Sequence, residues 1–191
     1  MYIYFKRVFD VFLVVVSAPV WLPLMLVLMG LVKASSKGPV FFTQKRYKKG
    51  QQFFTIYKFR SMYTDAPKDM PTHLLQNPEK MVTPIGRVLR KLSLDELPQL
   101  LNILKGDLSI VGPRPALWNQ DDLIAEREKY GANNVPVGLT GLAQITGRDE
   151  LSIEDKARQD GEYVKKMGLW TDVKIIVLTV VYAVVGKDVK S

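Results

Sequence analysis

The feature that most limits how this chain can fold is a long apolar segment near its start. The 22 residues from Val11 to Val32 carry no charged side chain. A segment of this length is long enough to cross the hydrocarbon core of a bilayer as one helix. Pro19 and Pro23 fall near the middle of the segment, and a proline inside a helix removes a hydrogen bond and bends it. We therefore expect a broken helix, in which the Ser17 hydroxyl replaces part of the lost hydrogen bonding.

Basic residues flank the apolar segment on both sides. Lys6 and Arg7 precede it, and six more follow: Lys33, Lys37, Lys45, Arg46, Lys48 and Lys49. Because lysine and arginine mark the cytoplasmic ends of membrane segments, both ends are expected on the cytoplasmic side. Residues 1–36 are accordingly predicted to form a re-entrant membrane hairpin, a helix–break–helix that returns to the face it entered. A kinked single span and a signal peptide are the alternatives, although no small-residue cleavage site ends the segment.

Composition narrows the chemistry of the rest of the chain. The 191 residues include no cysteine and a single histidine, His73, which excludes thiolate sites and disfavours Ser-His-Asp and His-metal catalysis. Catalysis must then depend on carboxylates, lysine, arginine, hydroxyls or a hard metal ion. The net charge of +8 suits nucleic acid, an anionic membrane surface or phosphorylated substrates. No nucleic-acid-binding module is recognisable, and the apolar segment favours the membrane.

Two adjacent carboxylates, Asp95 and Glu96, lie between a basic stretch and an apolar helical pattern. Pro98 is tolerated only in a first turn, which predicts a helix from about residues 93–95, with an apolar face formed by Leu94, Leu97, Leu101 and Leu104. Asp95 would then lie at a helix N-terminus, where negative charge is stabilised and a phosphate or metal–phosphate complex can bind. The alternative is an ordinary helix cap, because Ser93 and Glu96 have the spacing of a capping box.

A predicted β-hairpin carries the first candidate phosphate-binding residues. Two β-rich runs, residues 40–44 and 53–57, flank the basic, glycine-containing turn 45–50. Lys58 and Arg60 end the second run on one strand face, so they are expected to meet a phosphate together.

Two further arginines lie on either side of the carboxylate pair. Arg90 belongs to a short basic helix predicted over residues 85–91. Arg114 lies between Pro113 and Pro115, which fix its backbone and suit its guanidinium to bidentate phosphate binding. The alternative for Arg114 is a surface turn whose side chain is merely solvated.

The expected fold class is α+β and mainly helical. Residues 153–166 and 169–185 are predicted helices, and the second is expected to be buried or to lie along the membrane interface. The predicted domains are the hairpin, residues 1–36, and a catalytic domain on the cytoplasmic face, residues 37–191. The second domain would combine a small β-hairpin, a helical core and interfacial amphipathic helices.

Several motifs occur in one order along the chain: Tyr57-Lys58-Phe59-Arg60-Ser61-Met62, Leu92-Ser93-Leu94-Asp95-Glu96-Leu97-Pro98-Gln99-Leu100, Leu104-Lys105-Gly106-Asp107-Leu108-Ser109 and Val111-Gly112-Pro113-Arg114-Pro115. With Lys6-Arg7-Val8-Phe9-Asp10 and Gly141-Leu142-Ala143-Gln144-Ile145-Thr146-Gly147-Arg148, they resemble the monotopic polyprenol-phosphate phosphoglycosyl transferases, also called bacterial sugar transferases. The resemblance reaches as far as Asp172 and covers nearly the whole chain.

The resemblance implies transfer of a sugar 1-phosphate from a nucleotide-diphosphate sugar, with uridine as the expected base, to a membrane polyprenol phosphate. Nucleoside monophosphate would be released through a covalent aspartyl intermediate with Mg²⁺, in the first membrane step of glycoconjugate assembly. The implied location is the cytoplasmic face of the bacterial inner membrane, as a monotopic protein in contact with the lipid bilayer. A homo-oligomer is left open.

The resemblance assigns Asp95 and Glu96 as the catalytic pair and as ligands of Mg²⁺, a cation that prefers carboxylate and phosphate oxygens. The predicted substrate-binding residues are Lys58, Arg60, Arg90, Arg114, Arg148 and Asp160. An exposed, salt-bridged aspartate is the equal alternative for Asp160. In one place the chain departs from the family, because Pro136 and Val137 replace an expected Arg-Pro pair.

Two non-catalytic functions are alternatives to the enzymatic one. A membrane-tethered basic scaffold would explain the hairpin and the positive charge but assigns no role to Asp95, Glu96 and Arg114 together. A nucleotide-sugar-binding protein without catalysis would use the same basic residues. Nucleic acid is not expected as a partner, and DNA binding that persists at moderate salt would contradict this.

Overall fold

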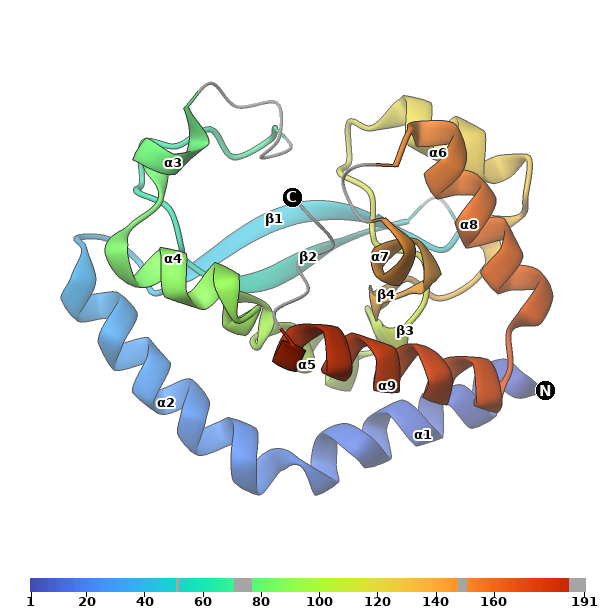
Figure 1. The fold of residues 1–191 in the computed structure, drawn as a ribbon, viewed down its shortest axis with the longest axis horizontal. Helices are drawn as coiled ribbons and strands as arrows, with labels where there is room; N and C mark the ends of the chain where they lie inside the picture. Colours follow the sequence, from blue (N-terminus) through green and yellow to red (C-terminus); the bar gives the residue numbers. More distant parts are fainter. Residues whose placement is uncertain (51, 71–76, 148–150, 186–191) are drawn as a thin grey trace.

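The computed structural model describes residues 1–50, 52–70, 77–147 and 151–185. Helices form most of the fold, together with two small two-stranded sheets. Figure 1 shows helices α1 (Tyr2–Val16) and α2 (Ala18–Ser35) as a bent arm along one edge of the molecule, with the sheets and the other helices above it. The prediction of a mainly helical α+β fold is confirmed.

The two helices of the arm meet at Ser17, two residues before the first proline. Pro19 is in the first turn of α2, where a missing backbone N–H leaves no helical hydrogen bond unmade, and Pro23 lies inside the helix. The Ser17 hydroxyl donates a hydrogen bond to the carbonyl oxygen of Leu13 at 2.7 Å. The predicted helix–break–helix is therefore confirmed, with the break displaced toward the N-terminus because a proline is tolerated at the start of a helix.

The arm has an inner face in the protein core and an outer face that is bare. Trp21, Met25, Leu28 and Val32 of α2 are buried in the main core. Large apolar side chains are exposed on the outer face: Tyr4, Phe5, Val8, Phe12, Val15, Val16, Val20, Leu22, Leu26, Val27 and Leu31. An apolar patch of this extent marks a membrane or protein contact. By length and composition, α2 is also sufficient to cross a bilayer, so the re-entrant course stays a prediction.

Two sheets support the centre of the fold. Strands β1 (Phe41–Lys48) and β2 (Gln52–Phe59) form an antiparallel hairpin in which Phe41 pairs with Phe59, so both strands are longer than predicted. Strands β3 (Ser109–Val111) and β4 (Gly138–Thr140) form a short parallel pair. This pair needs glycine, because a Cβ on Gly138 would lie 2.1 Å from the backbone nitrogen of Gly112.

The remaining helices surround these sheets. In chain order they are α3 (Pro78–Met81), α4 (Pro84–Lys91), the 3-10 turn η2 (Leu94–Glu96), α5 (Gln99–Lys105), α6 (Asp121–Glu128), the 3-10 turn η3 (Ala132–Asn134), α7 (Leu142–Thr146), α8 (Ile153–Lys166) and α9 (Leu169–Val185). Helices predicted near α4, α8 and α9 are confirmed. Trp170, Val177, Val180 and Val181 of α9 are exposed, but its placement at a membrane interface stays a prediction.

A buried polar cluster fastens the arm to the rest of the protein. Lys6, only 2 % exposed, forms an ion pair of 2.5 Å with Asp172 of α9. Asp172 also accepts hydrogen bonds from the hydroxyls of Tyr2 (2.7 Å) and Tyr163 (2.8 Å). Asp10 accepts one from Ser109 at 2.6 Å. Lys6 thus lies within α1 and inside the protein, and the division into two domains stays a prediction.

Candidate active site

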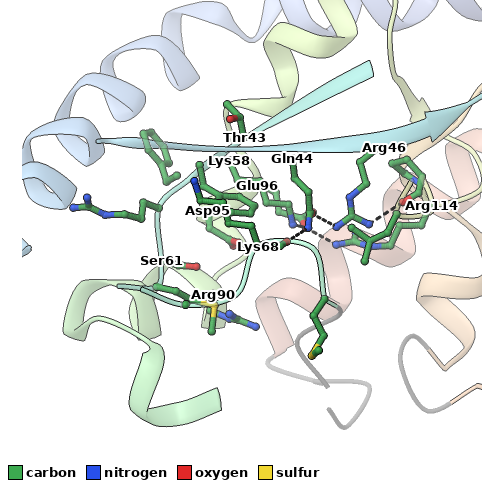
Figure 2. A pocket seen from close by; sticks show the side chains of 18 of the residues that line it. Thr43, Gln44, Arg46, Lys58, Ser61, Lys68, Arg90, Asp95, Glu96 and Arg114 are labelled. Carbon is green, nitrogen blue, oxygen red and sulfur yellow. Dashed lines mark hydrogen bonds and ion pairs between the residues drawn. The ribbon is translucent and has the colours of Figure 1, made fainter. Parts of the chain in front are cut away.

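A cavity of about 630 Å³ opens between the β-hairpin and the helical part of the chain. Its walls come from β1, the end of β2 and the segment of residues 60–70 that follows it, α4, η2, the loop that follows β3, and helices α6 to α8. Figure 2 shows Asp95 and Glu96 at its centre, with Lys58 beside them, Arg90 on one side and Arg114 on the other. The structure therefore brings together these five predicted site residues, which come from four separate parts of the sequence, and Arg60 also lines the cavity.

Glu96 lies between two cations. Its Oε1 accepts hydrogen bonds from Lys58 Nζ and from Arg114 Nη2, each at 2.7 Å. Burial by itself would raise the pKa of Glu96, but the charges of Arg114 and Lys58 and their hydrogen bonds outweigh it and hold that pKa well below its usual range. Glu96 therefore stays ionised near neutral pH and holds both cations at the cavity wall.

Asp95 has a different environment. Its carboxylate has no hydrogen-bond or ion-pair partner within the described ranges, although it lines the cavity. Burial raises the pKa of Asp95, the charge of Lys58 opposes this, and the neighbouring charge of Glu96 adds to the rise. Adjacent carboxylates whose pKa values shift in opposite directions take different roles in a site. Glu96 organises the cations, while the oxygens of Asp95 remain available to a reacting group.

The backbone around this pair differs from the prediction. Ser93 adopts a left-handed conformation with a φ of 54°, which a right-handed helix cannot continue. A single 3-10 turn follows, and α5 begins only at Gln99, after Pro98. The prediction that Asp95 lies at a helix N-terminus holds only for this 3-10 turn, and the predicted single helix from residues 93–95 to Leu104 is wrong. The capping alternative is also wrong, because Ser93 makes no capping hydrogen bond with its side chain.

Arg60 has a different set of contacts from Lys58. Its Nη1 donates to the carbonyl oxygen of Lys37 (2.9 Å), and its Nη2 donates to the carbonyl oxygen and hydroxyl of Ser36 (2.7 and 2.8 Å). Arg60 is 4 % exposed, so it fastens the end of α2 to the end of β2. These contacts favour a structural role, and phosphate binding by Arg60 stays a prediction.

Asp160 is buried on α8. Its Oδ2 lies 2.8 Å from Nε and 2.6 Å from Nη2 of Arg127, and Arg127 lines the cavity from α6. Burial raises the pKa of Asp160, although the nearby charge of Arg127 partly opposes this rise. The alternative of an exposed, salt-bridged aspartate is wrong about exposure, because Asp160 is buried, but the salt bridge is present. Asp160 contacts Arg127 and is not among the residues that line the cavity, so substrate binding by Asp160 stays a prediction. Arg148 lies outside the described residues.

Three residues of the cavity wall were not predicted as site residues. Arg127 belongs to a helix with acidic and basic residues throughout, which is typical of a solvated surface. Gln144 lies in the motif of residues 141–148, from which only the arginine and the glycines were predicted to bind substrate. Arg46 belongs to the basic turn predicted over residues 45–50, and only the longer β1 strand places it in the cavity, with its Nη1 donating to the Pro115 carbonyl oxygen at 3.1 Å.

The carboxylate pair fits Mg²⁺ only together with a phosphorylated substrate. Within the described ranges, no group of three or more histidine, cysteine or acidic residues is placed to hold a metal ion. Mg²⁺ is commonly bound through one or two carboxylates and substrate phosphates, so Asp95 and Glu96 are suitable donors. Because Oε1 of Glu96 already accepts from two cations, Asp95 is the better placed of the two. A Mg²⁺ site stays a prediction.

Comparison with known proteins decides the family. A family model described as bacterial sugar transferase matches residues 1–186. The chain belongs to the bacterial sugar transferase family. The resemblance carried by the motifs is confirmed, and so is the prediction of a transferase.

Relatives of this transferase carry names for different sugars. The chain is 38 % identical over 189 residues to the exopolysaccharide production protein ExoY of Sinorhizobium fredii, covering 92 % of this chain and 83 % of that protein. It is 40 % identical to the undecaprenyl-phosphate glucose phosphotransferase of Komagataeibacter xylinus (92 % of this chain, 35 % of that protein). It is 38 % identical to an N-acetylgalactosaminephosphotransferase of Aeromonas hydrophila that acts on undecaprenyl phosphate (94 % and 44 %). The chain thus spans less than half of the last two relatives.

Proposed function

We propose that this transferase moves a sugar 1-phosphate from a nucleotide-diphosphate sugar, with uridine as the base, to a membrane polyprenol phosphate and releases nucleoside monophosphate. The observation that carries the proposal is the carboxylate of Asp95, which has no partner among the described residues, beside the Lys58–Glu96–Arg114 cluster in one cavity. Family membership supports it, since relatives are named as undecaprenyl-phosphate sugar-phosphate transferases.

In the first step, a carboxylate oxygen of Asp95 attacks the β-phosphorus of the donor. The bond from that phosphorus to the oxygen shared with the α-phosphate breaks, and the nucleoside monophosphate leaves with the electron pair. An acyl phosphate between Asp95 and the sugar phosphate results. Lys58, Arg90 and Arg114 line the same cavity and offset the negative charge that develops on the phosphoryl oxygens. Bound Mg²⁺ would supply further charge neutralisation at the donor diphosphate.

In the second step, a phosphate oxygen of the polyprenol phosphate attacks the same phosphorus. The bond to Asp95 breaks and returns its carboxylate, while the sugar diphosphate remains on the lipid. Both displacements occur at one phosphorus, so a single cluster of cations serves both. A direct transfer would instead require both substrates to bind beside Asp95 at once.

A re-entrant arm would place this cavity at the cytoplasmic face of the inner membrane. The bare apolar face of α1 and α2 supports contact with lipid, and the anchoring of α1 through Lys6 to Asp172 supports a return of the arm to the side of the globular part. The first membrane step of glycoconjugate assembly is the step that such an enzyme would perform.

The re-entrant course predicts that both ends of the arm are accessible from the cytoplasm. The chain has no cysteine, so Tyr2→Cys and Ser35→Cys each introduce a unique label site. An impermeant thiol reagent should label both in inside-out vesicles and neither in right-side-out vesicles. Labelling of the two sites from opposite sides would make the arm a membrane span.

The acid limb of the pH–rate profile should depend on Asp95. The attacking carboxylate must be ionised, and the pKa of Asp95 lies above its ordinary value, whereas that of Glu96 lies below. As the pH falls through the raised pKa of Asp95, the carboxyl gains a proton and kcat/KM should decrease while the protein stays folded. An acid limb below the ordinary aspartate value of about 3.9 would contradict this assignment.

A release assay tests the proposed function. A panel of nucleotide sugars is supplied with Mg²⁺ and polyprenol phosphate, and nucleoside monophosphate is measured. The proposal predicts release that depends on the lipid for continued turnover. No release from any member, with the donor still bound, would favour a binding protein without catalysis, and the absence of binding would favour a membrane-tethered scaffold.

A further inference from the structure

We infer that the part of the cavity next to α6 and α7 is the subsite for the nucleobase of the donor, with Arg127 as the residue that binds the base edge. The inference rests on the proposed function, because it assigns the remainder of a donor whose diphosphate lies near Asp95. Figure 1 shows α4, which contacts η2, and the α6–α8 pair at opposite ends of the β-hairpin.

The cavity has two chemically different parts. Around the carboxylate pair, the wall carries the cations Lys58, Arg90 and Arg114, which suit a diphosphate. Toward α6 and α7 the wall contains the buried apolar residues Ala116, Leu117, Leu123 and Ala143, and the polar side chains there are Gln120, Arg127, Gln144 and Lys156. A nucleobase has two apolar faces and a polar edge, so it matches an apolar wall that contains a few fixed polar groups.

Arg127 supplies a fixed donor in this apolar part. The Nε and Nη2 of Arg127 bind Asp160, whereas the Nη1 of Arg127 has no hydrogen-bond partner in the described part of the chain. The side chain is 4 % exposed and lines the cavity, so the guanidinium is oriented before any ligand arrives. A donor held in this way suits a carbonyl oxygen on a base, because little side-chain entropy is lost on binding.

Gln144 adds an acceptor of known orientation. Its Nε2 donates to the Leu139 carbonyl oxygen at 3.0 Å, which identifies the other amide atom as oxygen. That Oε1 is buried and has no partner among the described residues, and Gln144 also lines the cavity. A donor and an acceptor together match a uracil-type base, in which a carbonyl oxygen adjoins an N–H. Cytosine offers an acceptor nitrogen where uracil offers that N–H.

The alternative is that the Arg127–Asp160 pair only joins α6 to α8. Arg127→Lys distinguishes the two, because lysine keeps the charge beside Asp160 but lacks the second fork of the guanidinium. Arg158→Lys is the matched control, since Arg158 is on α8 and largely exposed, and its ion pair is with Asp155. Folding of both variants is checked by thermal unfolding in nanodiscs.

Direct titration of the full chain with uridine 5′-monophosphate, cytidine 5′-monophosphate and ribose 5-phosphate tests the subsite. The unmodified protein should prefer the uridine nucleotide, and folded Arg127→Lys should bind it about tenfold or more weakly while its affinity for ribose 5-phosphate is unchanged. Unchanged uridine nucleotide binding, or equal losses for the nucleotide and ribose 5-phosphate, would overturn the inference. Arg158→Lys should match the unmodified protein.

Hydrogen exchange on the unmodified protein covers the case in which Arg127→Lys fails to fold. Uridine 5′-monophosphate should protect the amides of α6 and α7 more than ribose 5-phosphate does, and equal protection would overturn the inference. These readouts need no turnover. If the nucleotide binds in an Arg127-dependent way but no sugar phosphate is transferred, only the proposed function is contradicted. If transfer occurs but nucleotide binding does not depend on Arg127, only this inference is contradicted.

Discussion

Asp95→Asn is expected to reduce nucleoside monophosphate release by a factor on the order of 10⁴ or more, the scale seen when a covalent nucleophile is removed. The amide keeps the size of the side chain but cannot form the acyl phosphate. The cluster of Glu96 with Lys58 and Arg114 does not include Asp95, so donor binding should persist. Stopped-flow or quenched single-turnover release measures the chemical step, and equilibrium titration measures binding.

Two variants serve as controls for Asp95→Asn. Glu96→Gln should also lower turnover, but it removes the shared carboxylate of Lys58 and Arg114 and should weaken donor binding as well. Glu162→Gln, on the exposed face of α8, makes the same chemical change away from the cavity and should leave release unchanged. Release by Asp95→Asn within tenfold of the unmodified protein would contradict the assignment of Asp95 as nucleophile.

Lys6→Met should lower the free energy of unfolding by about 3–5 kcal/mol, because removing one partner of a buried ion pair leaves the other charge uncompensated. Asp172 is 1 % exposed and would keep only the hydroxyls of Tyr2 and Tyr163. Chemical denaturation in detergent micelles measures the change. Lys165→Met is the control, since Lys165 is 68 % exposed and an exposed ion pair contributes at most about 1 kcal/mol.

A double variant separates the ion pair from simple loss of packing. Lys6→Met with Asp172→Asn removes both charges, so part of the lost stability should return relative to Lys6→Met alone. If the two single losses simply add, Lys6 and Asp172 are not coupled. The arm would then be fastened to the globular part by apolar contacts and not by this cluster.

Features set by local chemistry could be predicted from the sequence. The prolines and Ser17 predicted a broken helix, and alternating β-rich runs around a glycine-containing turn predicted the hairpin of β1 and β2. Motif order placed Asp95, Glu96 and Arg114 in one site, and the cavity brings them together. In each case a few neighbouring residues determine the structure.

Features set by tertiary contacts could not be predicted in this way. The left-handed residue Ser93 separates α4 from the carboxylate pair, and the pair lies in a 3-10 turn of its own before α5, although the leucine spacing runs through both. Lys6 resembled a membrane-flanking charge but is buried against a residue 166 positions later. In the sequence Arg127 resembles a surface arginine, but in the structure it is paired with Asp160 of α8. Lys6 and Arg127 each depend on a partner that is distant in sequence and that no local pattern identifies.

The covalent intermediate is the central claim, and mass spectrometry of the intact protein tests it most directly. The protein is incubated with Mg²⁺ and a nucleotide sugar that supports release, without polyprenol phosphate, and is quenched rapidly in acid. The account predicts a mass increase of one phosphosugar, located on a peptide that contains Asp95, which disappears when polyprenol phosphate is added. No adduct under rapid quench, together with nucleoside monophosphate release only when both substrates are present, would contradict it and indicate direct transfer.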